Sequence, residues 1–436
     1  MRRVAVVLLL SATAIAQVPT QMSSGGPKVS ARARQIQNSA IVIDTHEDTP
    51  QRFVDENFDL GTITPVTKGM VDLAKIHEGN LGASFFSIWV DPKKYQGQYA
   101  HRALDLIDGV YEQAKKHPEQ VVMAFSPEDI ERAHQQHKYA ALMGLEGGHP
   151  IENDIRLLRD FYRLGIRYMT LTWSNTNEWA DSSGDINSTS VQHHNGLTDF
   201  GKQVVLEMNR LGMLVDISHV ADKTFYDAVE VSKAPVIASH SSSRALASHA
   251  RNMTDDMLKA VAKNNGVVMV NFYSAFLSDD YLHAEEAQSK DREAAIKAAV
   301  DQWKQQHPGE QVPYDVGDQV DKQWNAKLQR PPFEVLINHI DHIAKVAGID
   351  HVGLGSDFDG ITSAPVGVDS VADLPKITQG LLDRGYTAEQ IKKILGGNLL
   401  RVFHAAERVS REMRGKTPEW SPEKQSPTQR TQRTQR

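Results

Sequence analysis

Four short apolar runs in the chain each end at residue types that bind metal ions. The runs cover residues 40–43, 141–145, 213–218 and 235–239. They lead into His46 and Asp48, Glu146, His219 and His240, respectively. A short apolar run bounded by glycine and polar residues is typical of a strand buried on both faces of a parallel sheet. Because parallel strands end at a common surface, the pattern predicts a metal site on the rim of a barrel.

The rest of the chain alternates between apolar segments and segments of helical period. Further strands are predicted at 82–90, 166–172, 266–272 and 351–355. Amphipathic helices are predicted at about 101–118, 150–165, 197–212, 221–232, 253–265 and 333–348. Strands that alternate with helices indicate a parallel sheet, and eight of them favour a closed barrel over an open sheet. The predicted fold is therefore a (β/α)8 TIM-type barrel of the α/β class.

Residues 276–332 interrupt this alternation. The segment is polar and charged, with helical pieces rich in alanine and lysine at about 284–306. We expect a helical insertion after the seventh strand, lying over the catalytic face or at a subunit contact, as in a homodimer. Its composition does not decide between these locations, and a solvated helical excursion is the simplest interpretation.

The two ends of the chain differ in composition from the middle. A basic start at Met1–Arg3, a short apolar stretch and an Ala-x-Ala site ending at Ala16 are typical of a secretory signal peptide. The apolar stretch is short for a bilayer span, so export to the periplasm or medium is favoured over a stable membrane anchor. The expected organisation is a signal peptide at 1–16, a loose segment at 17–35, the barrel at 36–415 and a disordered tail at 416–436.

Charge and cysteine content exclude several classes of function. The formal net charge is −7, and removal of Arg2 and Arg3 with the signal peptide gives −7 − 2 = −9. An acidic protein is poorly suited to binding the negatively charged phosphate backbone of nucleic acids, so no nucleic acid partner is expected. The chain has no cysteine, which excludes disulfides, thiolate metal sites and a cysteine nucleophile. Any metal must be bound by histidines and carboxylates, which suits zinc, manganese or iron.

The strand-end residues form a plausible ligand set only when taken together. His46 and Asp48 lie two apart, so their side chains point the same way in extended chain. Glu146 ends a buried strand and needs a partner or a metal, although it could instead cap the next helix. His219 and His240 each follow a serine at a strand end, where a structural role is the simpler account of either one. Five ligands at four strand ends suit two ions, about 3.5–4 Å apart, that share a carboxylate.

Two later residues are candidates for catalysis and substrate binding. Asp357 lies in the Gly-rich segment 353–360 after the eighth strand, where a general acid or base would be needed. The alternative is a turn whose aspartates cap the backbone, which suits Asp359 better than Asp357. Arg251 follows His240 in the loop that leaves the sixth predicted strand. It could bind a substrate carboxylate or form a surface salt bridge.

Five motifs in order along the chain resemble those of the membrane (renal) dipeptidase family. They are Asp44–Pro50, Gly144–His149, Asp216–His219, Ser239–Ser242 and Gly355–Gly360. The resemblance extends over about residues 37–410. It implies a (β/α)8 zinc hydrolase that cleaves dipeptides, often with a D-residue at the C-terminal position.

The resemblance also assigns roles to the residues that match. It implies two Zn2+ ions per chain, one bound by His46 and Asp48 and the other by His219 and His240, with Glu146 as the bridge. Asp357 would carry the proton to the leaving amine, and Arg251 would bind the terminal carboxylate of the dipeptide.

One position departs from the family pattern. The family often has a histidine after Thr-Leu-Thr, where it contacts the substrate near the scissile bond, whereas this chain has Trp173. The indole N–H of Trp173 or the amide of Asn175 could still donate a hydrogen bond there. The alternatives to a dipeptidase are a barrel metallohydrolase acting on a lactam, cyclic amide or phosphoester, and an exported binding protein that has lost catalysis.

Overall fold

The computed structural model describes residues 25–310, 312–313 and 315–414. Its strands are β1 Ile43–Glu47, β2 Ala83–Trp89, β3 Val121–Met123, β4 Tyr139–Glu146, β5 Ile166–Thr170, β6 Leu214–Asp216, β7 Ile237–Ala238, β8 Val267–Val270 and β9 Val352–Leu354. They form one parallel sheet in the order β1-β2-β4-β5-β6-β7-β8-β9. A parallel bridge between Glu47 and Phe358 joins the first strand to the segment after the last. The sheet is thus a nearly closed eight-stranded barrel, and the predicted fold class is confirmed.

All eight predicted strands are present, and one strand was not predicted. The extra strand, β3, pairs with the first residues of β4 and lies off the path of the barrel. Its three residues, Val121–Met123, are apolar, but the strand is short and only Val121 is buried. It does not change the order of the eight barrel strands.

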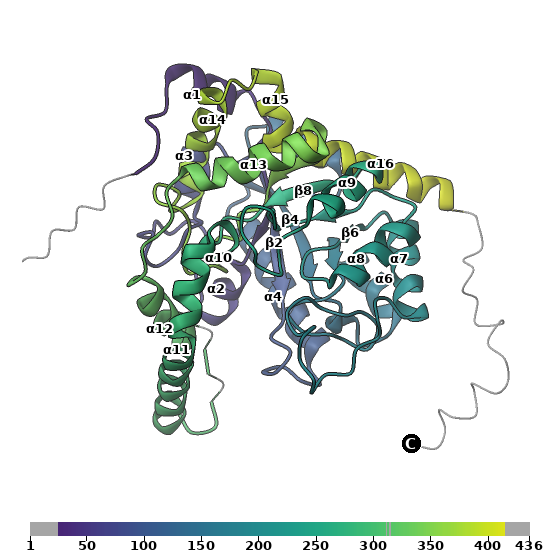
Figure 1. Cartoon of the computed structure of the whole chain (residues 1–436), viewed down its shortest axis with the longest axis vertical. Helices are drawn as coiled ribbons and strands as arrows, with labels where there is room; N and C mark the ends of the chain where they lie inside the picture. The colour runs from purple at the N-terminus through teal and green to yellow at the C-terminus, as the bar shows by residue number, and fades with distance from the viewer. Residues whose placement is uncertain (1–24, 311, 314, 415–436) are drawn as a thin grey trace, which may run out of the picture.

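Helices surround the sheet (Figure 1). Those predicted from the periodicity are α4 Tyr99–Lys116, α6 Ile155–Arg163, α7 Asp199–Leu211, α8 Asp222–Val231, α9 Asp255–Lys263 and α13 Glu334–Ala347. Further helices are α1 Ala31–Asn38, α2 Pro50–Asp55, α3 Leu73–Gly79, α5 Pro127–Gln135, α14 Leu374–Asp383, α15 Ala388–Lys392 and α16 Asn398–Met413. Local sequence sets their ends: the Thr198 side chain caps α7, and Gly212 ends it with a φ of 88°.

The barrel interior is packed with side chains rather than open. The rings of Phe85 and Tyr168 lie 5.3 Å apart inside it. The Phe403 ring of α16 lies 6.3 Å from Phe85, so α16 packs against the interior. A rigid, filled barrel is the kind of scaffold that holds side chains at strand ends in fixed positions.

The insertion is a helical hairpin after β8, the seventh strand of the barrel path. It comprises α10 Ser274–Leu277, α11 Asp279–Gln306 and α12 Asp315–Asn325, and the last two helices project from the body of the molecule (Figure 1). The buried residues of α11 are Tyr281, Leu282 and Glu285, all in its first two turns. The base of the hairpin is therefore anchored while most of α11 is solvated, as its composition indicates.

The ends of the chain are described only in part. Residues 31–35, expected to belong to a loose segment, are helical, because Ser30 caps α1 and Gln37 donates a hydrogen bond to the Gly79 carbonyl. The predicted signal peptide at 1–16, residues 17–24 of the loose segment and the predicted tail at 416–436 lie outside the described residues. In the described part of the chain, no helix has the length and apolar character needed to cross a bilayer.

Candidate metal centre

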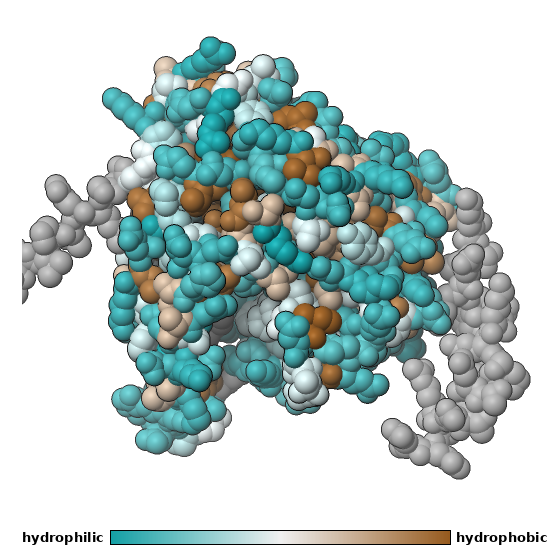
Figure 2. Space-filling model, in the orientation of Figure 1, coloured by the Kyte–Doolittle hydropathy of each residue, from teal (hydrophilic) through white to brown (hydrophobic). Residues whose placement is uncertain are grey.

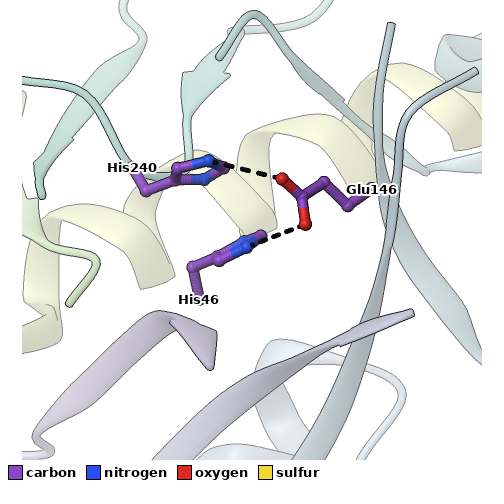
Figure 3. A group of neighbouring side chains, drawn as sticks. All are labelled: His46, Glu146 and His240. Atoms are coloured by element: carbon purple, nitrogen blue, oxygen red, sulfur yellow. Dashed lines mark ion pairs between the residues drawn. The ribbon is translucent and has the colours of Figure 1, made fainter. Parts of the chain in front are cut away.

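The five ligand candidates from the strand ends meet at one point on the barrel rim. His46 lies in β1, Glu146 is the last residue of β4, and His219 and His240 follow β6 and β7 closely. Asp48, the fifth candidate, follows directly after β1. All five side chains are buried. Figure 3 shows His46 and His240 both facing the carboxylate of Glu146. The convergence expected from parallel strands is therefore present.

Glu146 lies at the centre of the cluster and directs one oxygen to each side. Its Oε2 atom is 3.2 Å from Nε2 of His46, which is also 3.6 Å from Oδ2 of Asp48. Its Oε1 atom is 3.0 Å from Nε2 of His219 and 3.7 Å from Nε2 of His240. The two Nε2 atoms of His219 and His240 are 2.9 Å apart. This is the arrangement that a carboxylate bridging two neighbouring ions requires.

Hydroxyl groups orient two of the imidazoles through their other nitrogen. Nδ1 of His46 lies 2.7 Å from the Tyr168 hydroxyl, and Nδ1 of His240 lies 2.8 Å from the Ser239 hydroxyl. Ser239 donates its own proton to Asp216 at 2.6 Å, so it accepts from Nδ1–H of His240. That leaves the Nε2 lone pair of His240 free to bind a metal, as in the hydrogen-bonded histidines of known metal sites.

Two further hydroxyl groups hold the remaining ligands. Ser174 lies 3.3 Å from Nδ1 of His219, and Ser87 donates to Oε2 of Glu146 at 2.8 Å. The sequence analysis identified neither serine as functional, nor Tyr168. Ser87 lies in β2, Tyr168 in β5 and Ser174 in the loop after β5. Only the register of the strands reveals that these side chains reach the ligand cluster.

The electrostatics of the cluster favour a bound cation. Burial opposes protonation of His46, but Glu146 and Asp48 outweigh it and raise the pKa of the imidazole to about 10. Burial and the charge of Glu146 raise the pKa of Asp48 well above its usual range, and burial raises that of Asp357. Nε2 of His46 is buried without a hydrogen bond, although it faces two carboxylates. Buried carboxylates and imidazole lone pairs that face one another fit a divalent metal such as zinc.

Asp357 lies beside Asp48 at the seam where the barrel closes. Its side chain accepts a hydrogen bond of 2.8 Å from Nδ2 of Asn271, while Oδ1 of Asn271 accepts one of 2.6 Å from the Tyr273 N–H. Together with His46 and Asp48, Asp357 forms a second group of mutually close ligand-type atoms. Asn271 follows directly after β8, so the strand-end rule applied above could have identified it.

The backbone is strained at Asp357 and at His219, and at the seam it leaves no room for a residue larger than glycine at position 360. Asp357 has a φ of 67° and His219 a φ of 65°, a region that side chains other than glycine adopt rarely and mostly where function demands it. A Cβ atom at Gly360 would lie 2.0 Å from Oδ2 of Asp48 and 2.8 Å from Oδ1 of Asp357. Asp359 instead accepts hydrogen bonds from the Met70 N–H and Thr49, which is the structural role expected for it.

Arg251 is buried beside the cluster and does not form a surface salt bridge. Its guanidinium donates to the His240 carbonyl at 3.1 Å and to the Ser241 hydroxyl at 3.3 Å. No carboxylate of the described residues lies within ion-pair distance of it, and burial lowers its pKa to about 10. A buried cation without an anionic partner is suited to bind an anionic ligand.

Trp173 and Asn175 lie in the loop after β5. The Trp173 ring centroid is 5.0 Å from that of Trp89 and 6.3 Å from that of His219. Oδ1 of Asn175 is buried without a hydrogen bond. The indole of Trp173 therefore borders the ligand cluster, whereas no contact of Asn175 with it is seen.

Comparison with known proteins supports the family resemblance. The model of the membrane dipeptidase family, peptidase family M19, matches residues 30–417. The chain belongs to the membrane dipeptidase family. This is a family of metal-dependent peptidases, and the chain is accordingly a metallodipeptidase by family.

Solved structures confirm the fold. The probable dipeptidase PvdM from Pseudomonas aeruginosa is 24% identical with a TM-score of 0.71, over 87% of this chain and 98% of that one. The dipeptidase AC, a metallopeptidase of family M19, is 24% identical with a TM-score of 0.67, over 84% and 99%. A metallopeptidase from Rhodobacter sphaeroides, liganded with a phosphinate mimic of the dipeptide L-Ala-D-Ala, is 23% identical with a TM-score of 0.66, over 84% and 100%.

Proposed function

We propose that this metallodipeptidase is a binuclear zinc enzyme that hydrolyses free dipeptides, including those with a C-terminal D-residue. The observation that carries the proposal is the position of Glu146, with one carboxylate oxygen facing His46 and the other facing His219 and His240. One ion would be held by His46 and Asp48, the other by the two later histidines, and Glu146 would bridge them. When bound, such an ion pair polarises a carbonyl group and lowers the pKa of a water molecule.

The remaining residues have roles that follow from their positions. Arg251, buried without an anionic partner, would bind the terminal carboxylate of the dipeptide. Asp357, held by Asn271, would deliver a proton to the nitrogen of the leaving amine. Trp173 and Asn175 would border the scissile bond, where the indole excludes water. Export after cleavage near Ala16 remains part of the proposal.

Metal analysis and a dipeptide screen test this function. We expect two zinc ions per chain, turnover of L-L, L-D or Gly-D dipeptides, and loss of turnover in Glu146→Gln without loss of folding. Glu47→Gln is a matched control, because Glu47 is also a buried glutamate at a strand end but faces Tyr139 rather than the ligand cluster. Full activity of Glu146→Gln would rule out the bridging role.

The role of Arg251 has its own test. Arg251→Ala should raise KM for free dipeptides strongly and have little effect on C-terminally amidated ones, since only the former carry the carboxylate. Equal effects on both substrates would favour a different barrel metallohydrolase, with no need for a substrate carboxylate.

A further inference from the structure

A cleft of about 730 Å³ lies between the α11–α12 hairpin and the barrel mouth. Figure 2 shows this face of the molecule hollowed between the projecting hairpin and the body. The Lys94 ammonium donates to the Val312 carbonyl at 2.6 Å, which ties the loop after β2 to the connection between α11 and α12. The volume is within the range of about 300–1,000 Å³ that is typical of small-molecule sites.

The cleft borders the candidate metal centre. Gly360 lines it, is exposed, and lies against the side-chain oxygens of both Asp48 and Asp357. Trp89 also lines the cleft, and its ring lies tilted against that of Trp173 at the edge of the ligand cluster. The cleft and the ligand cluster therefore adjoin at Gly360 and at the Trp89–Trp173 pair.

The lining is apolar in part, and several of its charges are already neutralised. Trp89, Ile296 and Val300 contribute apolar surface from the barrel and from α11. Two of the lining carboxylates form ion pairs: Asp55 with Arg102 at 2.9 Å and Asp321 with Arg292 at 3.3 Å.

A third lining carboxylate, that of Asp318, is paired with Lys322 at 2.7 Å. Lys93, Lys94 and Lys304 also line the cleft, but all three are exposed. Asp91 and Glu310 complete the charged part of the lining. The apolar wall of Trp89, Ile296 and Val300 is the part that can bury an uncharged, apolar side chain.

Sheet order indicates which part of a dipeptide faces the cleft. Of the cleft residues, Trp89 ends β2 and Lys94 follows it, whereas Arg251 follows β7. In the eight-strand path, three strands separate β2 from β7 in either direction, so the two lie on opposite sides of the mouth. With its carboxylate on Arg251, a dipeptide would direct its N-terminal residue toward the cleft.

We infer that this cleft is a substrate subsite that takes a large apolar or aromatic side chain on the N-terminal residue of the dipeptide. The inference rests on the proposed dipeptidase function and adds a substrate class to it. Burial of such a side chain should raise kcat/KM about 10–100-fold over alanine at the same position.

Gly317 on α12 allows the cleft to be filled from the hairpin. A Cβ atom there would have only the Ile296 side chain within 4 Å, at 3.5 Å, and the glycine has no left-handed φ. Gly317→Trp should therefore occupy the cleft, while Gly317→Ala adds one methyl group as the matched control. Val300→Trp fills the cleft from α11 and serves as the second variant if Gly317→Trp does not fold.

The experiment measures kcat/KM for Ala-Gly, Leu-Gly, Phe-Gly and Trp-Gly with the zinc-loaded full chain. We expect the wild type to prefer Phe-Gly and Trp-Gly. Gly317→Trp or Val300→Trp should lower kcat/KM tenfold or more for these two and less than twofold for Ala-Gly, with Gly317→Ala unchanged. Equal losses for all four substrates, or no loss in either folded tryptophan variant, would overturn the subsite. Absence of any dipeptide turnover by the wild type would instead reject the proposed function itself.

Discussion

The hydrogen bond between Tyr168 and His46 should set the metal affinity of the first ligand pair. Tyr168 is fully buried in the barrel, and its hydroxyl lies 2.7 Å from Nδ1 of His46. This contact holds the ring so that Nε2 faces Glu146 and Asp48. Without it, the ring can rotate or place its proton on Nε2, and either change removes a metal ligand.

Tyr168→Phe is the perturbation, and its cost can be estimated. Loss of such an outer hydrogen bond typically weakens metal affinity about 10–100-fold, or about 1.4–2.8 kcal/mol. The phenyl ring keeps its packing against Phe85, so the fold should persist with a loss of about 1 kcal/mol in the free energy of unfolding. Metal affinity is measured by competition with a chelator of known affinity, and stability by chemical denaturation of the metal-free protein.

Tyr139→Phe is the matched control. Tyr139 is also buried, but its hydroxyl lies 3.5 Å from Glu47 and does not contact a ligand candidate. It should leave metal affinity unchanged. The reasoning fails if Tyr168→Phe binds zinc within about threefold of the wild type, or if both variants weaken binding equally.

Three other perturbations have clear expected outcomes. Asn271→Ala should lower kcat about tenfold or more and leave KM nearly unchanged, because Asp357 loses the donor that positions it; steady-state kinetics separates the two parameters. Gly144→Ala should destabilise the protein by about 1–3 kcal/mol in chemical denaturation, because its Cβ atom would lie 1.9 Å from Cζ of Tyr168. Removal of the metal by a chelator should lower the free energy of unfolding by about 2.7 kcal/mol for each site whose free metal concentration was a hundred times its Kd. An unchanged unfolding curve with chelator would contradict a metal bound in the cluster.

The barrel could be predicted from sequence because its strands are buried on both faces. Each of the eight strands overlaps a short apolar run with polar or glycine boundaries, although β1 shares only Ile43 with its run. That pattern does not depend on neighbouring strands. The exceptions depend on tertiary contacts. β3 is three residues long and largely half-buried, and α1 buries Gln37 through hydrogen bonds to Gly79 and Thr378 that only the folded chain brings together.

The ligand candidates were accessible to sequence reasoning, whereas the residues that orient them were not. Histidines and carboxylates at strand ends carry a chemical signal of their own. Tyr168 lies within β5, and its role arises because Gly144 of β4 is its register partner and leaves space for the ring. A glycine within an apolar run does not reveal which strand will lie beside it, so this pairing could not be predicted.

Trp173 connects the departure from the family pattern with the shape of the mouth. Its indole lies between Trp89 and His219, so two indoles form an apolar wall on one side of the ligand cluster. The family often places an imidazole there, which could donate a proton or a charged hydrogen bond, and an indole offers only an N–H donor. Because Trp89 also lines the cleft beside the hairpin, this wall continues into the proposed subsite. A preference for apolar N-terminal residues would then come from one continuous surface that begins at Trp173.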